Sequence, residues 1–128
     1  MNKFDGSITY TKNVALRKIT YSNYLKITFS NFIAPSLGSV NILFSGRGAT
    51  GLIVIGASSY SDFRIAKNFA SLEGYYIPIV YIKDRLSNNP IYIDVGGGLE
   101  ANVMIMSQRV EIASIETVDN VPSDYSEY

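Results

Sequence analysis

Apolar and polar residues alternate along three segments of the chain, and this alternation predicts β-strands. In residues 24–30 the apolar positions are Leu25, Ile27 and Phe29. Because successive side chains of a strand point to opposite faces, these residues are expected to share one buried face. Residues 40–45 and 91–95 repeat the pattern, so they are predicted to form two more half-buried strands.

Further strands are expected where β-branched or aromatic residues gather between Gly, Asn, Ser or Pro. These segments are residues 14–21, 52–55, 75–83, 103–106 and 110–115. The short connections, rich in turn-forming residues, fit antiparallel pairing. We therefore predict an all-β domain, an antiparallel β-sandwich or jelly roll of about eight strands.

Residues 62–72 form the one segment whose pattern also allows a helix. The residues that would share a helical face are Phe63, Ala66, Phe69 and Ala70. Ser61 could cap the first turn. An irregular strand fits the segment equally well, because a short apolar run does not separate the two periods. A short helix at 62–72 and a strand both remain open at this point.

The length of 128 residues suits one domain with a hydrophobic core. We expect an N-terminal docking segment or first strand in residues 1–18, a β-sandwich domain in residues 19–121, and a polar, acidic tail in residues 122–128. The N-terminus lacks the apolar stretch of a secretion signal, and the longest apolar run, residues 52–55, is too short to cross a membrane. Neither a signal peptide nor membrane insertion is expected.

The composition excludes several kinds of chemistry. The chain has no Cys, His or Trp, which rules out thiol and imidazole catalysis, disulfides, and zinc sites that need Cys or His. Its acidic residues stand singly, without the paired or spaced carboxylates of a calcium loop or a glycosidase. The 11 basic and 11 acidic residues cancel, so no net field would attract nucleic acid. We expect no enzyme activity, no cofactor, no metal and no nucleic-acid partner.

Residues 46–51 read Gly-Arg-Gly-Ala-Thr-Gly and match the G-x-G-x-x-G pattern of dinucleotide-binding proteins. In that motif the third glycine opens a helix whose N-terminus meets the pyrophosphate. Here Gly51 opens residues 52–55, which have strand propensity. The segment is therefore predicted to be a loop between two strands.

Ten tyrosines are present, and several fall on or beside predicted strands. Tyr suits both subunit interfaces and sugar stacking, although ordinary strand propensity explains it equally well. The candidate ligand or interface residues are Tyr75, Tyr76, Tyr81, Tyr92 and Arg47. Residues 52–55 and 77–82 are apolar on both strand faces, so these strands either lie centrally in a sheet or are covered by another subunit.

The order of strands resembles the C-terminal β-sandwich modules of phage tail-fibre, baseplate and head-fibre proteins, especially those of phages that infect gut bacteria. The resemblance covers roughly residues 24–121 and is carried by residues 24–29, 40–46, 79–84, 91–95 and 110–112, followed by Val121 and Pro122. These are patterns of strand spacing, and no functional residue is carried over from them. Only about 19 residues precede the module here, whereas a tail fibre has a long shaft.

The resemblance implies a trimer that binds a host glycan or surface protein without catalysis or a cofactor. We therefore expect a phage virion structural protein, a short head or tail fibre or decoration subunit. It would form a homotrimer, dock onto other virion proteins through its N-terminal segment and reside in the virion. The alternative is a stand-alone carbohydrate-binding module that stacks exposed Tyr on sugar rings. An enzyme with a carboxylate or tyrosine mechanism ranks third.

Overall fold

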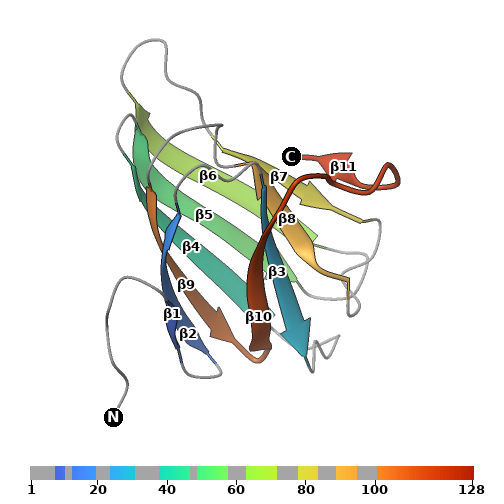
Figure 1. The fold of residues 1–128 in the computed structure, drawn as a ribbon, viewed down its shortest axis with the longest axis horizontal. Helices are drawn as coiled ribbons and strands as arrows, with labels where there is room; N and C mark the ends of the chain where they lie inside the picture. The colour runs from blue at the N-terminus through green and yellow to red at the C-terminus, as the bar shows by residue number, and fades with distance from the viewer. Residues whose placement is uncertain are drawn as a thin grey trace.

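The protein is a β-sandwich of two antiparallel sheets, seen in a computed structural model (Figure 1). The structure describes residues 8–10, 13–19, 24–30, 38–46, 49–57, 63–71, 78–83, 89–94 and 101–128. These residues form eleven strands and no helix. The predicted all-β, antiparallel sandwich is confirmed, with more strands than the eight expected.

One sheet has six strands in the order β1-β2-β9-β4-β5-β6. Their bounds are β1 Ile8–Tyr10, β2 Val14–Ile19, β9 Ala101–Gln108, β4 Gly38–Gly46, β5 Ala49–Ala57 and β6 Phe63–Ser71. The hairpins β4–β5 and β5–β6 form one half of the sheet, and β9 inserts between β4 and β2. The sheet therefore joins the N-terminal strands to a strand from late in the chain.

The other sheet has five strands in the order β10-β3-β8-β7-β11. Their bounds are β10 Glu111–Val118, β3 Tyr24–Ser30, β8 Ile91–Asp94, β7 Ile79–Ile82 and β11 Ser126–Glu127. After β10 the chain passes from one edge of this sheet to the other, where β11 pairs with β7. The segment expected as a polar tail thus contains a short edge strand.

The possible helix at 62–72 is wrong, because this segment forms strand β6. Every residue from Phe63 to Ser71 has a register partner on β5. Ile65 and Phe69 pack against the core, while Ala66 and Ala70 are exposed. A spacing of four positions fits a helix face and a strand face alike, so the pairing with β5 decides between them.

The core lies between the two sheets and is built by alternate residues of their inner strands. The six-stranded sheet contributes Ala15, Val40, Ile42, Phe44, Ile53, Ile55, Val103 and Ile105. The five-stranded sheet contributes Leu25, Ile27, Phe29, Val80, Ile82, Ile91, Ile93, Ile112 and Ile115, and Val110 lies in the turn before β10. This interdigitated layer is the main source of stability in such a fold.

An irregularity in β10 explains how Ile112 and Ile115 both reach the core. Residues three positions apart point to opposite faces of a regular strand. The register with β3 shifts between Ile112 and Ser114, which leaves Ala113 as an extra, exposed residue. A bulge of this kind turns the following side chains to the other face. Both isoleucines are consequently buried.

Two basic side chains of the six-stranded sheet bridge to the opposite sheet at its two sides. On β2, the Arg17 guanidinium donates a hydrogen bond of 2.6 Å to the Ile115 carbonyl. On β6, Lys67 Nζ donates to the carbonyls of Pro78, at 3.3 Å, and Tyr128, at 3.0 Å. The two charged donors thus add hydrogen bonds between the sheets, and the Tyr128 oxygen also accepts one from the Val80 N–H at 3.0 Å.

The connection from β9 to β10 crosses from one sheet to the other and is fixed by a polar cluster. The buried Ser107 hydroxyl donates to the Val110 carbonyl at 2.8 Å. The Asn13 side-chain amide donates to the carbonyls of Ser107 and Val110, at 3.1 and 3.0 Å. Between them, Arg109 adopts a φ of 63°, the left-handed conformation that tight turns use. The cluster satisfies the polar backbone of the corner.

Candidate functional site

The structure brings together two of the five predicted site residues. Tyr81 on β7 and Tyr92 on β8 are direct register partners in the five-stranded sheet. Arg47, Tyr75 and Tyr76 lie outside the described residues. Tyr81 and Tyr92 point away from the core, because their neighbours Val80, Ile82, Ile91 and Ile93 fill it.

Tyr92 is only 6% exposed although it lies on the outer face, because Tyr125 covers it. The two rings meet edge to face with centroids 5.0 Å apart, and the Tyr125 hydroxyl donates to the Pro90 carbonyl at 3.0 Å. Burial, the neighbouring Tyr92 and the charge of Asp124 raise the pKa of Tyr125 to about 12. Tyr125 therefore stays neutral and holds the C-terminal segment against β8.

Tyr81 keeps part of its ring accessible and pairs with Tyr24 of β3. Their centroids lie 5.9 Å apart with an interplanar angle of 81°, and both side chains are half-buried. Burial, followed by the charge of Glu127, raises the pKa of Tyr81, whose hydroxyl also hydrogen-bonds to Glu127. We call the set Tyr24, Tyr81, Tyr92 and Tyr125 the tyrosine face.

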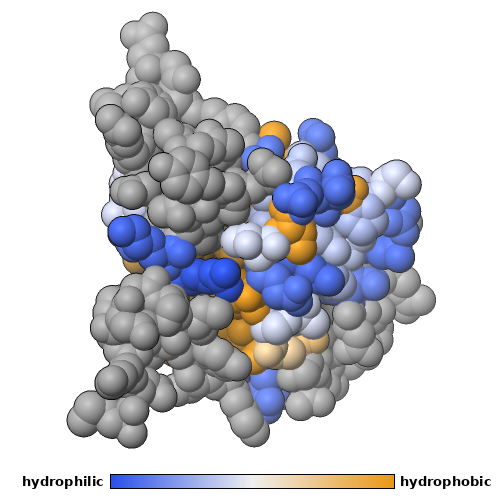
Figure 2. All heavy atoms as spheres, viewed as in Figure 1, coloured by the Kyte–Doolittle hydropathy of each residue, from blue (hydrophilic) through white to orange (hydrophobic). Residues whose placement is uncertain are grey.

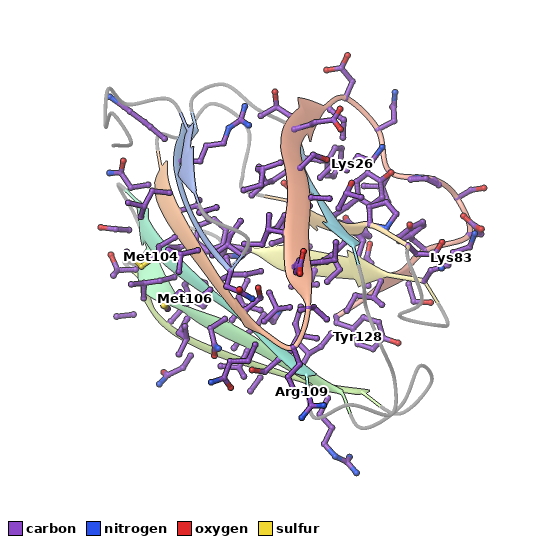
Figure 3. The ribbon with its side chains drawn as sticks, turned by 90° about the horizontal axis from the view of Figure 1, so that it is seen from below. Lys26, Lys83, Met104, Met106, Arg109 and Tyr128 are labelled. Carbon is purple, nitrogen blue, oxygen red and sulfur yellow. The ribbon has the colours of Figure 1, made fainter. Side chains whose placement is uncertain are left out.

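Polar and charged residues surround the tyrosine face. Lys26 is the register partner of Tyr92, and Glu116 of Lys26. Lys83, which is labelled in Figure 3, forms an ion pair of 2.8 Å with Asp124 near the edge of the sheet. Figure 2 shows mostly hydrophilic residues on the side where Figure 1 places the five-stranded sheet. This side therefore combines aromatic rings with charged groups.

The outer face of the six-stranded sheet is different, because its central rows are mostly apolar. One row across the strands runs Leu16, Met104, Leu43, Leu52 and Asn68, and the next runs Val14, Met106, Asn41, Val54 and Ala66. Val14 is 40% exposed and Leu43 is 41% exposed. We call the residues Val14, Leu16, Leu43, Leu52, Val54, Met104 and Met106 the apolar face.

Polar residues border the apolar face on two sides. The register places Lys18, Asn102, Ser45 and Thr50 in the row on one side, and Gln108, Ser39 and Arg64 on the other. Lys18 and Arg64 are the charged side chains that the described outer face carries, and they lie at opposite corners. The sheet thus presents an apolar centre with a polar border, as binding surfaces do.

The glycine motif at 46–51 stands between two strands, but the strands reach further than predicted, because Gly46 belongs to β4 and residues 49–51 belong to β5. Arg47 and Gly48 lie outside the described residues. Gly46 ends β4 and Gly51 lies inside β5, opposite Phe44 on one side and Phe69 on the other. The two phenylalanine rings approach across it, with centroids 6.0 Å apart. Gly51 therefore serves packing and opens no helix at which a pyrophosphate could bind.

The described residues contain no group of three or more acidic residues placed to hold a metal ion. Within the same part of the chain, no helix is long and apolar enough to cross a membrane. The described surfaces that carry distinctive chemistry are thus the tyrosine face and the apolar face.

Tyr24 and Tyr125 complete a cluster of which the sequence indicated only two members. Tyr24 was visible as a residue of the clearest strand, but its contact with Tyr81 across β8 depends on the strand order. Tyr125 falls in the segment interpreted as a polar tail, where no alternation marks it.

No protein-family model, curated protein or solved structure matches the chain.

Proposed function

We propose that this protein is a non-enzymatic structural subunit that forms a homotrimer through its apolar face, as part of a phage fibre or decoration. The observation that carries the proposal is the pair of apolar surfaces on one sheet. Strand β4 buries Ile42 in the core and presents the neighbouring Leu43 outward. A sheet that works alone normally has one apolar and one polar face.

Burying the apolar face would release a favourable free energy. Each Å² of apolar surface removed from water is worth about 25 cal/mol. Leu43 and Val14 are both about two fifths exposed, and Met104 and Met106 between them are half-buried. No described element packs over these rows, because every described strand belongs to one of the two sheets. The proposal places the covering surface on another chain.

Charge favours a second copy of this chain as the occupant. The chain has no net charge, so copies do not repel one another over distance. Lys18 and Arg64 lie at opposite corners of the described outer face, away from its centre. Association through the central rows brings no like charges together there. Closed symmetric oligomers of identical subunits are the common outcome of such surfaces.

This arrangement leaves the tyrosine face on the outside of the assembly. Its rings, with Lys26 and Glu127 beside them, suit contact with a host glycan or surface protein. Because Val14 and Leu16 of β2 belong to the apolar face, docking onto other virion proteins would fall to the part of the N-terminal segment before β2. The placement in a phage particle rests on the resemblance in strand spacing described above.

The proposal is tested with two lysine substitutions on strand β4. Leu43→Lys places a charge in the centre of the apolar face and is expected to give monomers, because a buried unpaired charge opposes association. Ser45→Lys adds the same charge two residues away on the same face, in the polar border, and is expected to leave the oligomer intact. Light scattering after size-exclusion chromatography measures the oligomer mass of each variant.

Circular dichroism of both variants serves as the control for folding. If Leu43→Lys has the same mass as the unsubstituted protein, the apolar face is not the interface. If Ser45→Lys dissociates the oligomer as completely as Leu43→Lys does, the added charge dissociates it wherever it is placed on this face. The proposal that the apolar centre is the interface then also fails.

A second candidate function is a carbohydrate-binding module, favoured by the half-buried Tyr24 and Tyr81 pair. On a glycan array, Tyr81→Ala is expected to abolish the signal, whereas Tyr81→Phe keeps the ring and most of the binding. Tyr128→Ala removes a tyrosine outside the pair and is expected to bind normally. Binding that survives both Tyr24→Ala and Tyr81→Ala would contradict a role for this pair.

A further inference from the structure

Two methionines occupy the centre of the apolar face. Met104 and Met106 lie two positions apart on β9, so both side chains point to the outer side of the sheet, away from the other sheet (Figure 3). Met104 lies between Leu16 and Leu43 in one apolar row, and Met106 lies beside Val14 in the next. Both are half-buried and therefore accessible in the single subunit.

Methionine differs from its apolar neighbours because its thioether can be oxidised. A hydroperoxide transfers one oxygen atom to the sulfur: the O–O bond breaks, an S=O bond forms, the sulfur loses two electrons, and water or an alcohol is released. The product is a polar, chiral sulfoxide in place of a flexible apolar group. Leucine and valine, which make up the rest of the apolar face, do not undergo this reaction.

The composition directs such an oxidant to very few side chains. The chain has no Cys, His or Trp and only three methionines, of which Met1 is the third. Two of the three methionines thus lie next to one another in the apolar face. A peroxide has little else to react with in this protein.

We propose that Met104 and Met106 are an oxidation site that controls self-association, a proposal that rests on the function proposed above. Oxidation of the free subunit places two polar sulfoxides where a second copy must pack against apolar rows. Association in turn buries the two sulfurs and protects them. Oxidation therefore weakens association, and association slows oxidation.

The test compares the unsubstituted chain with the double variant Met104→Leu/Met106→Leu. Leucine has nearly the same volume and hydrophobicity, so the variant is expected to associate like the unsubstituted protein. Both proteins are treated with hydrogen peroxide in dilute solution, oxidation is located by peptide mass spectrometry, and the oligomer mass is measured by light scattering. A short methionine-containing peptide is added to both proteins and serves as the reference for the rate of oxidation.

Peroxide is expected to raise the dissociation constant of the unsubstituted protein about tenfold for each sulfoxide, and to leave the double variant unchanged. Met104 and Met106 are also expected to oxidise more slowly in concentrated than in dilute protein, whereas the rate for the added peptide stays the same. Circular dichroism checks that the oxidised chain remains folded.

The outcomes separate this inference from the proposed function. An oligomer that persists with both methionines fully oxidised overturns the inference and leaves the proposed self-association standing. If peroxide dissociates the oligomer of the double variant as well as that of the unsubstituted protein, the inference is also overturned, because oxidation elsewhere would be the cause. A protein that is monomeric before any peroxide is added overturns both.

Discussion

Replacing Ile42 with alanine is expected to lower the free energy of unfolding by about 3–4 kcal/mol, within the range of large-to-small substitutions in well-packed cores. Ile42 is fully buried in the middle of the six-stranded sheet, between Ile105 on β9 and Ile53 on β5. Both neighbours are held by strand pairing on each side, so they cannot move in to fill the cavity. Urea unfolding followed by circular dichroism measures the loss.

The matched control is Leu43→Ala, one residue further along β4. Leu43 points to the other face and is 41% exposed, so its truncation is expected to cost the single subunit less than about 1 kcal/mol. The two proteins are compared at a concentration low enough that association does not contribute to stability. Equal losses for Ile42→Ala and Leu43→Ala would contradict the assignment of one face to the core and the other to an interface.

Replacing Gly51 with alanine is expected to lower the free energy of unfolding by about 2–3 kcal/mol, as overpacking does in a tight interior. A Cβ atom at this position would collide with the Asn68 carbonyl oxygen and lie 2.6 Å from Cγ of Phe69. The first of these atoms belongs to the backbone of β6, which is fixed by its ladder with β5. The new methyl group must therefore push β6 and its phenylalanine away from Phe44.

Gly56→Ala, on the same strand, is the control for this substitution. A Cβ atom at Gly56 would meet nothing within 4 Å. The same change is therefore expected to be neutral, or to stabilise by up to about 0.5–1 kcal/mol because alanine loses less backbone freedom on folding. Thermal unfolding of both variants distinguishes the destabilising effect of the steric clash from the effect of alanine on backbone entropy. A Gly51→Ala variant as stable as Gly56→Ala would contradict the close approach of β6 to β5.

Strand positions could be predicted wherever one face is buried and the other is polar. Residues 24–30 are the clearest case, and β3 has these bounds. The period-two rule fails for β6, whose apolar Ile65 and Phe69 stand four apart and also fit a helix. It also gives no sign of β11, because an edge strand of two exposed residues buries no side chain that would mark it.

The candidate site was only partly predictable, because its contacts join segments far apart in the chain. Strand propensity placed Tyr81 and Tyr92 on strands, and this is correct. That Tyr125 covers Tyr92 depends on the path of the chain from β10 across the sheet to β11. Local pattern carries no information on such a path, so Tyr92 could be proposed as a surface residue although it is buried.

The two-sided apolar strands allowed a choice between a central position and a covered outer face. Strand β5 is indeed central, with β4 and β6 on either side. Its central position accounts for the backbone pairing but not for Leu52 and Val54, which lie on the outer side with Met104, Leu43 and their neighbours. The proposed self-association accounts for these residues as well.

The most direct test of self-association through the apolar face is the mass of the unsubstituted protein, measured by size-exclusion chromatography with light scattering across a dilution series. A mass near three times 14.1 kDa that falls only at high dilution is the expected result. A mass of 14.1 kDa at every concentration would contradict the assembly and would favour the carbohydrate-binding alternative.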